Sequence, residues 1–185
     1  MNIYFDFDGV LTTNKSGFML FCENISKKTQ ISLEKVMECY GRYADDIYTG
    51  RKVYSDIWEG FCQCLGKEIE FSSEFFETGK NEEMFALVRA LREKGHFLGI
   101  ISDNSKERAD FVVAKFGLGE LFDQVILSSE EGCMKTDKEI FKDVHKPAIF
   151  IDNSEKNLIV PKELGIKTIY YEENSSVEAL KEIIF

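Results

Sequence analysis

Two carboxylates and a glycine follow the first apolar run of the chain. Asp6 and Asp8 come directly after Ile3–Phe5, a run of β-branched and aromatic residues that predicts a buried strand. Carboxylates are seldom buried unless they are paired or bind a metal ion. Two acidic groups at one strand end repel each other, so they require a cation between them or a proton on one of them. On this stretch alone, a strand that simply runs into an acidic turn is the alternative.

Polar side chains also follow the predicted strands 97–101, 122–127 and 148–151. They are Ser102, Lys135, Asp152 and Asn153. Because parallel strands bring their carboxyl ends to one edge of a sheet, we expect these groups to lie beside Asp6 and Asp8. Together they would supply a nucleophilic carboxylate, a second carboxyl for proton transfer, hard oxygen ligands for Mg²⁺, and an ammonium to neutralise a phosphoryl group. Singly, each could be a helix cap, a loop acid or a solvated cation.

The elements that must position these groups alternate between strand and helix from about residue 81 onward. A fifth strand is predicted over 167–171. Helices are predicted over 84–91, from a capping box of Asn104 with Glu107, after Thr136, over 154–164 with a break at Pro161, and from Ser175. This alternation predicts an α/β fold, with a parallel sheet, right-handed crossovers and helices on both faces.

Residues 14–79 show no strand alternation, and their apolar residues recur at helical spacing. The first of three predicted helices carries the apolar stripe Phe18, Phe21, Cys22 and Ile25. The second begins at Ser32, and the third holds Tyr54 and ends at Gly66. We therefore expect a discontinuous core of residues 1–13 and 80–185 and a small helical cap of residues 14–79. The aromatic stripes are interpreted as packing faces.

Composition narrows the class of protein. The 185 residues carry a formal net charge of −10, which disfavours a nucleic-acid or anionic-membrane surface. We expect no signal peptide and no membrane-spanning run, hence a cytoplasmic protein. The five cysteines show no framework spacing, and we expect them to be reduced thiols.

Four ordered stretches of the sequence resemble the motifs of the haloacid dehalogenase superfamily. They are Asp6-Phe7-Asp8-Gly9-Val10-Leu11, Ile100-Ile101-Ser102, Lys135, and Phe150-Ile151-Asp152-Asn153. The resemblance covers almost the whole chain. It includes a helical cap inserted after the first motif, where the run Gly50–Gly66 is similar to a glycine turn followed by an aromatic-containing helix.

The resemblance implies a Rossmann-like core and a Mg²⁺-dependent phosphatase. Its substrate would be a small phosphorylated metabolite, a sugar phosphate or similar phosphomonoester, hydrolysed through an aspartyl phosphate. Asp6 would be the nucleophile and Asp8 the proton donor and acceptor. The implied metal ligands are the side chains of Asp6 and Asp152 with the backbone carbonyl of Asp8. The implied phosphate-binding residues are Ser102, Lys135, Gly9 and Asp103.

Two positions depart from the family pattern. Asn153 stands where a second aspartate is common, which removes a negative charge near the metal and leaves Asn153 as a metal ligand or a neighbour of one. Thr136 follows the motif lysine where proline is common, and both residues start helices acceptably.

The same residues are compatible with other functions. A phosphomutase shares the nucleophile, and a non-catalytic binding protein could retain the fold. A dehalogenase is disfavoured because a leaving halide does not need Asp8, and a response regulator because no phosphoacceptor follows the third strand. Substrate identity and oligomeric state are left open. The candidates for specificity in the cap are Asp45, Asp46, Tyr48, Arg51, Lys52 and Trp58.

Overall fold

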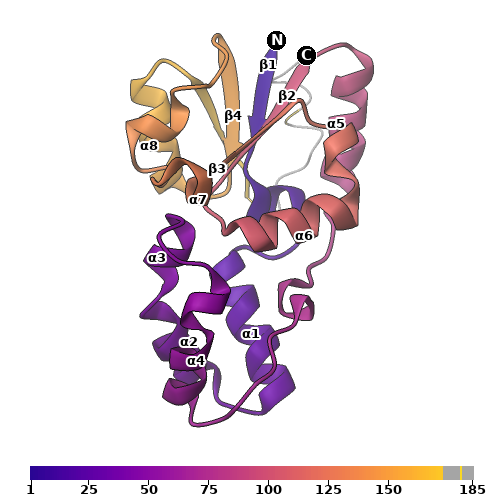
Figure 1. The fold of residues 1–185 in the computed structure, drawn as a ribbon. Helices are drawn as coiled ribbons and strands as arrows, with labels where there is room; N and C mark the ends of the chain where they lie inside the picture. The colour runs from indigo at the N-terminus through magenta and orange to yellow at the C-terminus, as the bar shows by residue number, and fades with distance from the viewer. Residues whose placement is uncertain (173–179, 181–185) are drawn as a thin grey trace.

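The computed structural model describes residues 1–172 and residue 180. It consists of a sheet flanked by helices, which we call the core, and a cluster of helices below it, which we call the helical subdomain (residues 17–76; Figure 1). The chain passes between the two parts twice, through a first linker (residues 12–16) and a second linker (residues 77–81). The terminal helix predicted from Ser175 lies outside the described residues.

Five parallel strands form the centre of the core, in the order β3-β2-β1-β4-β5. They are β1 Asn2–Phe5, β2 Phe97–Ser102, β3 Gln124–Leu127, β4 Ala148–Asp152 and β5 Lys167–Tyr170. Strand β1 lies in the middle and pairs with β2 on one side and β4 on the other. All four strand pairings are parallel, so the carboxyl ends of the strands meet at one edge. The predicted α/β fold is confirmed.

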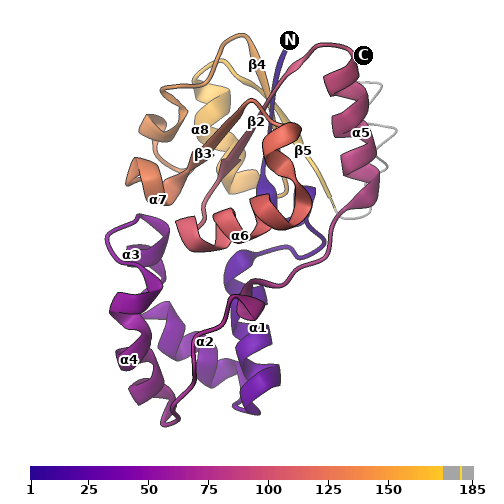
Figure 2. The ribbon, with the colours of Figure 1, turned by 45° about the vertical axis from the view of Figure 1, so that its right-hand side comes forward.

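Helices cover both faces of this sheet (Figure 2). They are α5 Glu82–Glu93 and α6 Lys106–Phe116 on one face and α8 Glu155–Glu163 on the other, with the short helix α7 Ser128–Glu131 after β3. Side chains alternate along β1. Ile3 and Phe5 pack with the buried face of α5, whereas Tyr4 packs on the opposite side with Phe150 and Leu158. Burial on both faces explains why the strands read as continuous apolar runs.

Aromatic rings fill the helical subdomain. Its helices are α1 Gly17–Thr29, α2 Leu33–Gly41, α3 Ala44–Tyr48 and α4 Tyr54–Leu65, followed by a 3₁₀ turn at Ser73–Phe76. The ring of Phe21 is buried against the rings of Tyr40, Tyr54 and Phe61. Offset and tilted ring contacts of this kind stabilise a core beyond their buried area. The aromatic stripes are therefore packing faces, as predicted.

The start of α6 differs from the prediction. Ser105, not Asn104, caps this helix, because its hydroxyl accepts a hydrogen bond from the backbone N–H of Arg108 at 3.2 Å. The side chain of Asn104 points instead toward Asp8, to which its Nδ2 donates at 3.2 Å. The predicted capping box with Glu107 is wrong, and Glu107 has another partner, described below.

Two further helix predictions are wrong. The chain after Thr136 forms only a 3₁₀ turn, Lys138–Phe141, because Asp137 accepts a hydrogen bond from the backbone N–H of Met134 and turns the chain early. Helix α8 continues through Pro161 without a break. Pro161 is buried inside the last turn of the helix, where it removes one intrahelical N–H donor without ending the helix.

Two of the five cysteines form a disulfide, Cys39–Cys64, which joins α2 to α4. The expectation that all five are reduced is wrong for this pair, since the two residues are far apart in sequence and their spacing gave no sign of pairing. Cys22, Cys62 and Cys133 are free. Among the described residues, no helix is long and apolar enough to cross a membrane.

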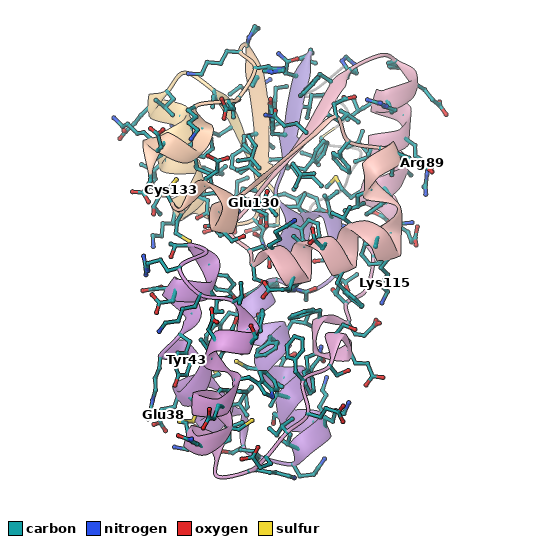
Figure 3. All side chains as sticks on the ribbon, in the orientation of Figure 1. Glu38, Tyr43, Arg89, Lys115, Glu130 and Cys133 are labelled. Atoms are coloured by element: carbon teal, nitrogen blue, oxygen red, sulfur yellow. A yellow bond between two sulfur atoms is a disulfide. The ribbon has the colours of Figure 1, made fainter. Side chains whose placement is uncertain are left out.

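Contacts to the core come from both the helical subdomain and the linker that follows it. The carboxylate of Glu107 on α6 accepts a hydrogen bond from the backbone N–H of Tyr54 at 3.0 Å, and so satisfies a donor at the start of α4. Gly50 lies against the backbone carbonyl of Ser129 on α7, and a Cβ at Gly50 would lie 1.9 Å from that oxygen. Lys115, which Figure 3 labels near the end of α6, pairs with Glu77 of the second linker.

The disulfide predicts a redox-dependent stability. We expect Cys39→Ser to lower the free energy of unfolding by about 2–4 kcal/mol, because the bond restrains the unfolded chain. Denatured native protein should expose three reactive thiols without reductant and five with it. Cys133→Ser, which removes a free cysteine, is the control. Five thiols before reduction would contradict the bond.

Gly50 and Gly66 form a matched pair for testing the contact between the two parts. Both have positive φ, +67° and +69°, but a Cβ at Gly66 meets nothing within 4 Å. Alanine at either position should cost about 1–2 kcal/mol of backbone strain. Only Gly50→Ala should also push the helical subdomain away from Ser129 and raise the radius of gyration in X-ray scattering. Equal radii for the two variants would show that the Gly50 contact does not hold the parts together.

Candidate functional site

The carboxyl edge of the sheet holds four of the predicted site residues, all buried. Asp6 follows β1, Ser102 ends β2, Asp152 ends β4, and Lys135 lies in the loop after α7. The exposed fractions of Asp6 and Lys135 are 4% and 2%, and that of Asp152 is 0%. The sheet therefore brings together groups that are separated by up to 146 positions in the sequence.

The ammonium of Lys135 bridges two carboxylates. Its Nζ lies 2.6 Å from Asp6 Oδ1 and 2.7 Å from Asp152 Oδ2. Burial alone would lower the pKa of Lys135, but the charges of Asp6 and Asp152 raise it, so the lysine stays protonated. Burial raises the pKa of Asp6 well above its usual range, and Lys135 opposes this only in part. The negative charge of Asp152, which shares the same ammonium, raises the pKa of Asp6 further.

Surrounding groups fix the bridge in place. Asp152 Oδ1 accepts a hydrogen bond from the backbone N–H of Ser154 at 2.7 Å, and Asn157 Nδ2 donates to both Asp152 oxygens. Asp103 Oδ1 accepts from the backbone N–H of Lys135 at 2.9 Å. Burial raises the pKa of Asp103, against the effect of Lys135. Asp103, a predicted phosphate-binding residue, thus uses its side chain to hold the lysine loop.

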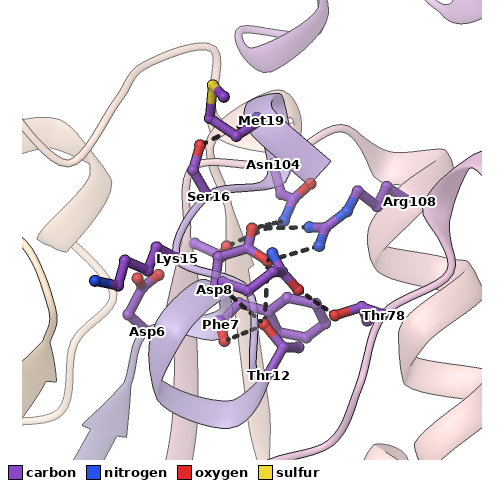
Figure 4. Close-up of polar contacts among 12 residues, drawn as sticks. Asp6, Phe7, Asp8, Thr12, Lys15, Ser16, Met19, Thr78, Asn104 and Arg108 are labelled. Atoms are coloured by element: carbon purple, nitrogen blue, oxygen red, sulfur yellow. Dashed lines mark hydrogen bonds and ion pairs between the residues drawn. The ribbon is translucent and has the colours of Figure 1, made fainter. Parts of the chain in front are cut away.

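Asp8 lies in a separate cluster (Figure 4). It occupies a tight turn, Phe7–Leu11, in which Gly9 has a φ of +79°. The carboxylate of Asp8 accepts two hydrogen bonds from Arg108, Nη1 to Oδ2 at 2.8 Å and Nη2 to Oδ1 at 2.6 Å. Burial alone would lower the pKa of Arg108, but the charge of Asp8 raises it. The two carboxylates of the first motif therefore have different cations.

Three neutral side chains complete the Asp8 cluster. They are Thr12, Asn14 and Asn104, whose donors lie 3.3, 2.9 and 3.2 Å from the Asp8 oxygens. Neither these three residues nor Arg108 were predicted as site residues. One feature of the sequence could have identified Arg108. It precedes Val112 by one helical turn and so belongs to the apolar face of α6. A charged residue on a buried face requires a partner.

Gly9 and Asn153 lie side by side at the edge of the site. A Cβ at Gly9 would lie 2.0 Å from Asn153 Nδ2, so the close approach requires glycine. Asn153 Nδ2 donates to the backbone carbonyl of Lys15 at 3.2 Å. Asn153 thus links the loop after β4 to the first linker, and its amide donor is not directed at Asp6 or Asp152.

Three of the cap residues predicted for specificity, Arg51, Lys52 and Trp58, are not brought to this edge. Arg51 and Lys52 pair with Asp46 on the surface of the helical subdomain. Trp58 packs within that subdomain and donates to the backbone carbonyl of Ile69 at 2.6 Å. Arg51 and Lys52 therefore pair with a neighbouring carboxylate. Their spacing in the sequence could not show whether they would bind this carboxylate or a substrate.

Tyrosines of the helical subdomain lie nearer to the Asp8 cluster. The hydroxyls of Tyr40 and Tyr54 are 2.8 Å apart and buried. Burial raises the pKa of Tyr54 to about 12, while the nearby charge of Arg108 opposes the shift. Burial also raises the pKa of Tyr48, again with Arg108 opposing it. These phenols form the polar part of the helical subdomain that faces the core.

A cavity of about 660 Å³ opens beside the two linkers. Gly9, Thr12 and Asn153 reach it from the site side, and Lys80 and Tyr171 from the far side. Its lining does not include Asp6, Lys135 or Asp152. Among the described residues, no group of three or more His, Cys, Asp or Glu side chains is arranged to hold a metal.

Comparison with protein families gives a match over nearly the whole sequence. A family model described as haloacid dehalogenase-like hydrolase matches residues 3–170. No curated protein matches the sequence.

Solved structures match over their full length or most of it. A haloacid dehalogenase (HAD) family enzyme from Bacteroides thetaiotaomicron, a variant in complex with magnesium and inorganic phosphate, is 23% identical, with a TM-score of 0.80 and 97% of each chain covered. A HAD phosphatase from Thermococcus onnurineus is 19% identical, with a TM-score of 0.67, covering 99% of this chain and 97% of that one. The L-2-haloacid dehalogenase from Xanthobacter autotrophicus is 15% identical, with a TM-score of 0.65, covering 99% and 82%. These similarities show a shared fold.

The bridge predicts that Lys135 is needed for stability. Lys135→Met leaves two carboxylates buried without a cation, and we expect the free energy of unfolding to fall by about 3–5 kcal/mol in urea titrations. Lys142→Met removes an exposed ammonium that pairs with Glu131, and this variant should change the free energy of unfolding by less than about 1 kcal/mol. Adding Asp152→Asn to Lys135→Met should recover part of the loss. Similar effects of the two lysine variants would contradict this account.

Proposed function

Because this chain belongs to the haloacid dehalogenase-like hydrolase family, we propose that it is a phosphatase of small phosphorylated metabolites. The observation that carries the proposal is the buried bridge of Asp6, Lys135 and Asp152 at the carboxyl edge of the sheet. A nucleophilic carboxylate beside a fixed ammonium suits phosphoryl transfer, since the phosphoryl oxygens need positive charge around them.

We assign Mg²⁺ as the cofactor. The donor set fits it, because Asp6 and Asp152 supply hard carboxylate oxygens and the backbone carbonyl of Asp8 supplies a third. The ammonium of Lys135 already lies between these carboxylates, and the trio of side chains still carries a formal charge of minus one that favours a further cation. When bound, Mg²⁺ would neutralise charge on the phosphoryl oxygens. The magnesium and phosphate complex of the Bacteroides enzyme supports this assignment.

Each residue of the site has its own role in the proposed reaction. Lys135 holds Asp6 Oδ1, which assigns Oδ2 as the atom that attacks phosphorus while the bond to the leaving oxygen breaks. Asp8 gives a proton to the leaving oxygen. In the second half, Asp8 takes a proton from water as that water attacks the aspartyl phosphate, and phosphate leaves as Asp6 is restored. Ser102 and Lys135 bind the phosphoryl oxygens.

Two other functions make different use of the same groups. A phosphomutase would transfer the phosphoryl group from Asp6 back to a substrate and would release no phosphate. A non-catalytic protein would bind Mg²⁺ and phosphate without turnover. The presence of Asp8, which a leaving alkoxide requires and a leaving halide does not, favours a phosphate ester over a haloacid as the substrate.

Phosphate release from a panel of small phosphate esters tests the proposal. We expect release with Mg²⁺ and none with EDTA, and a loss of at least about a thousandfold in kcat for Asp6→Asn, which removes the nucleophile. Asp143→Asn, at an exposed carboxylate outside the site, should keep native activity.

Each contrary result would indicate a different nucleophile or a different function. Equal release from the native chain and Asp6→Asn would exclude Asp6 as the nucleophile. Isomerised ester without free phosphate would indicate a mutase. Saturable phosphate binding in Mg²⁺ with no turnover of any ester would indicate a binding protein.

A further inference from the structure

Asp8 occupies a buried site built to bind a carboxylate. Arg108 donates to both of its oxygens, and Thr12, Asn14 and Asn104 donate three further hydrogen bonds. A carboxylate offers about four lone-pair positions. These five donors therefore leave Asp8 no position for a leaving group or a water molecule.

The helical subdomain encloses this ion pair. A Cβ at Gly17, the first residue of α1, would lie 2.8 Å from Asp8 Oδ2 and 2.9 Å from Arg108 Nη1. The hydrogen bond from the backbone N–H of Tyr54 to Glu107, the residue before Arg108, places the start of α4 against α6 at 3.0 Å. A ligand group bound to Arg108 would thus lie between the core and the helical subdomain.

The role proposed for Asp8 requires it to leave Arg108. The side chain of Arg108 is 2% exposed, and a buried cation that loses its partner is strongly unfavourable. Its Nε has no hydrogen-bond partner within the described part of the chain, nor has Oδ1 of the adjacent Asn104. The guanidinium therefore needs a replacement anion whenever Asp8 turns toward the phosphoryl group.

We propose that Arg108 is a specificity-determining residue that binds a carboxylate on the leaving part of the substrate. The inference rests on the proposed function and narrows its substrate class to a phosphorylated hydroxycarboxylic acid. The substrate carboxylate takes the place of the Asp8 carboxylate on the two Nη groups, and Asp8 is released to transfer protons. Asp8 is thus held away from water until a substrate with the correct second group is bound.

The geometry favours a carboxylate over a second phosphate. The group that Arg108 holds in this structure is itself a carboxylate, in a two-point contact of 2.6 and 2.8 Å that matches the planar guanidinium. The close approach of Gly17 leaves little room for a tetrahedral group of three oxygens at the same place.

Three esters of one three-carbon chain test the proposal on the native protein. They are propyl phosphate, phosphooxypropionate and propanediol bisphosphate, which end in a methyl, a carboxylate and a phosphate. We expect kcat/KM for phosphooxypropionate to exceed that for propyl phosphate by at least about tenfold. Equal values, or a preference for the bisphosphate, would overturn the assignment of a carboxylate.

Variants then assign the preference to Arg108. Arg108→Gln should abolish the preference for the carboxylate, while Arg108→Lys should keep part of it. Lys106→Gln removes an exposed cation from the same helix and should leave the preference unchanged. If Lys106→Gln lost the preference as fully as Arg108→Gln, the positive charge of α6 would select the substrate, and not the two-point contact of the Arg108 guanidinium.

Binding to Asp6→Asn separates this inference from the proposed function. Calorimetric titration of Asp6→Asn with phosphooxypropionate and propyl phosphate, in Mg²⁺, measures selectivity without turnover. A tighter Kd for phosphooxypropionate supports the role of Arg108 even if the native chain hydrolyses no ester. Equal Kd values overturn it even if the native chain proves to be a phosphatase.

Discussion

The structure of the site depends on one ammonium between two buried carboxylates. Asp6 and Asp152 belong to neighbouring strands, so the sheet forces them together, and the resulting repulsion would oppose folding without Lys135. Lys135 in turn depends on Asp103, which holds its backbone. The compensation is incomplete, since one positive charge faces two negative charges. Burial raises the pKa of Asp6, and the uncompensated charge of Asp152 adds to the rise.

The second carboxylate of the first motif is compensated differently. Asp8 turns away from the bridge and pairs with Arg108, a residue of α6, beneath the first turn of α1. The chain thus separates its two acids by giving each its own cation. One pair lies wholly within the core and the other at the junction with the helical subdomain. The proposed proton transfer and substrate selection would therefore both take place where the two parts meet.

Much of this arrangement follows from local patterns in the sequence. Apolar runs gave the strands, and the rule that parallel strands end at one edge placed Asp6, Ser102, Lys135 and Asp152 together. The pairings of Asp8 and of Cys39 with Cys64 did not follow, because they join distant elements through side-chain directions that periodicity does not contain. The partner of Arg51 and Lys52 did not follow either. Their charge suggested a ligand, and in the structure both pair with a near neighbour, Asp46.

The two linkers have a consequence for the order in which the chain folds. Thr12 and Lys80 form an antiparallel bridge, and the backbone N–H of Asn81 donates to the carbonyl of Leu11. A helical subdomain that has already folded holds these linkers side by side. Strand β1 then meets β2 across a shorter effective loop, which lowers the loop-closure cost of the first pairing of the sheet by about 1 kcal/mol. The insertion that separates the strands in sequence would thus act as a template for their pairing.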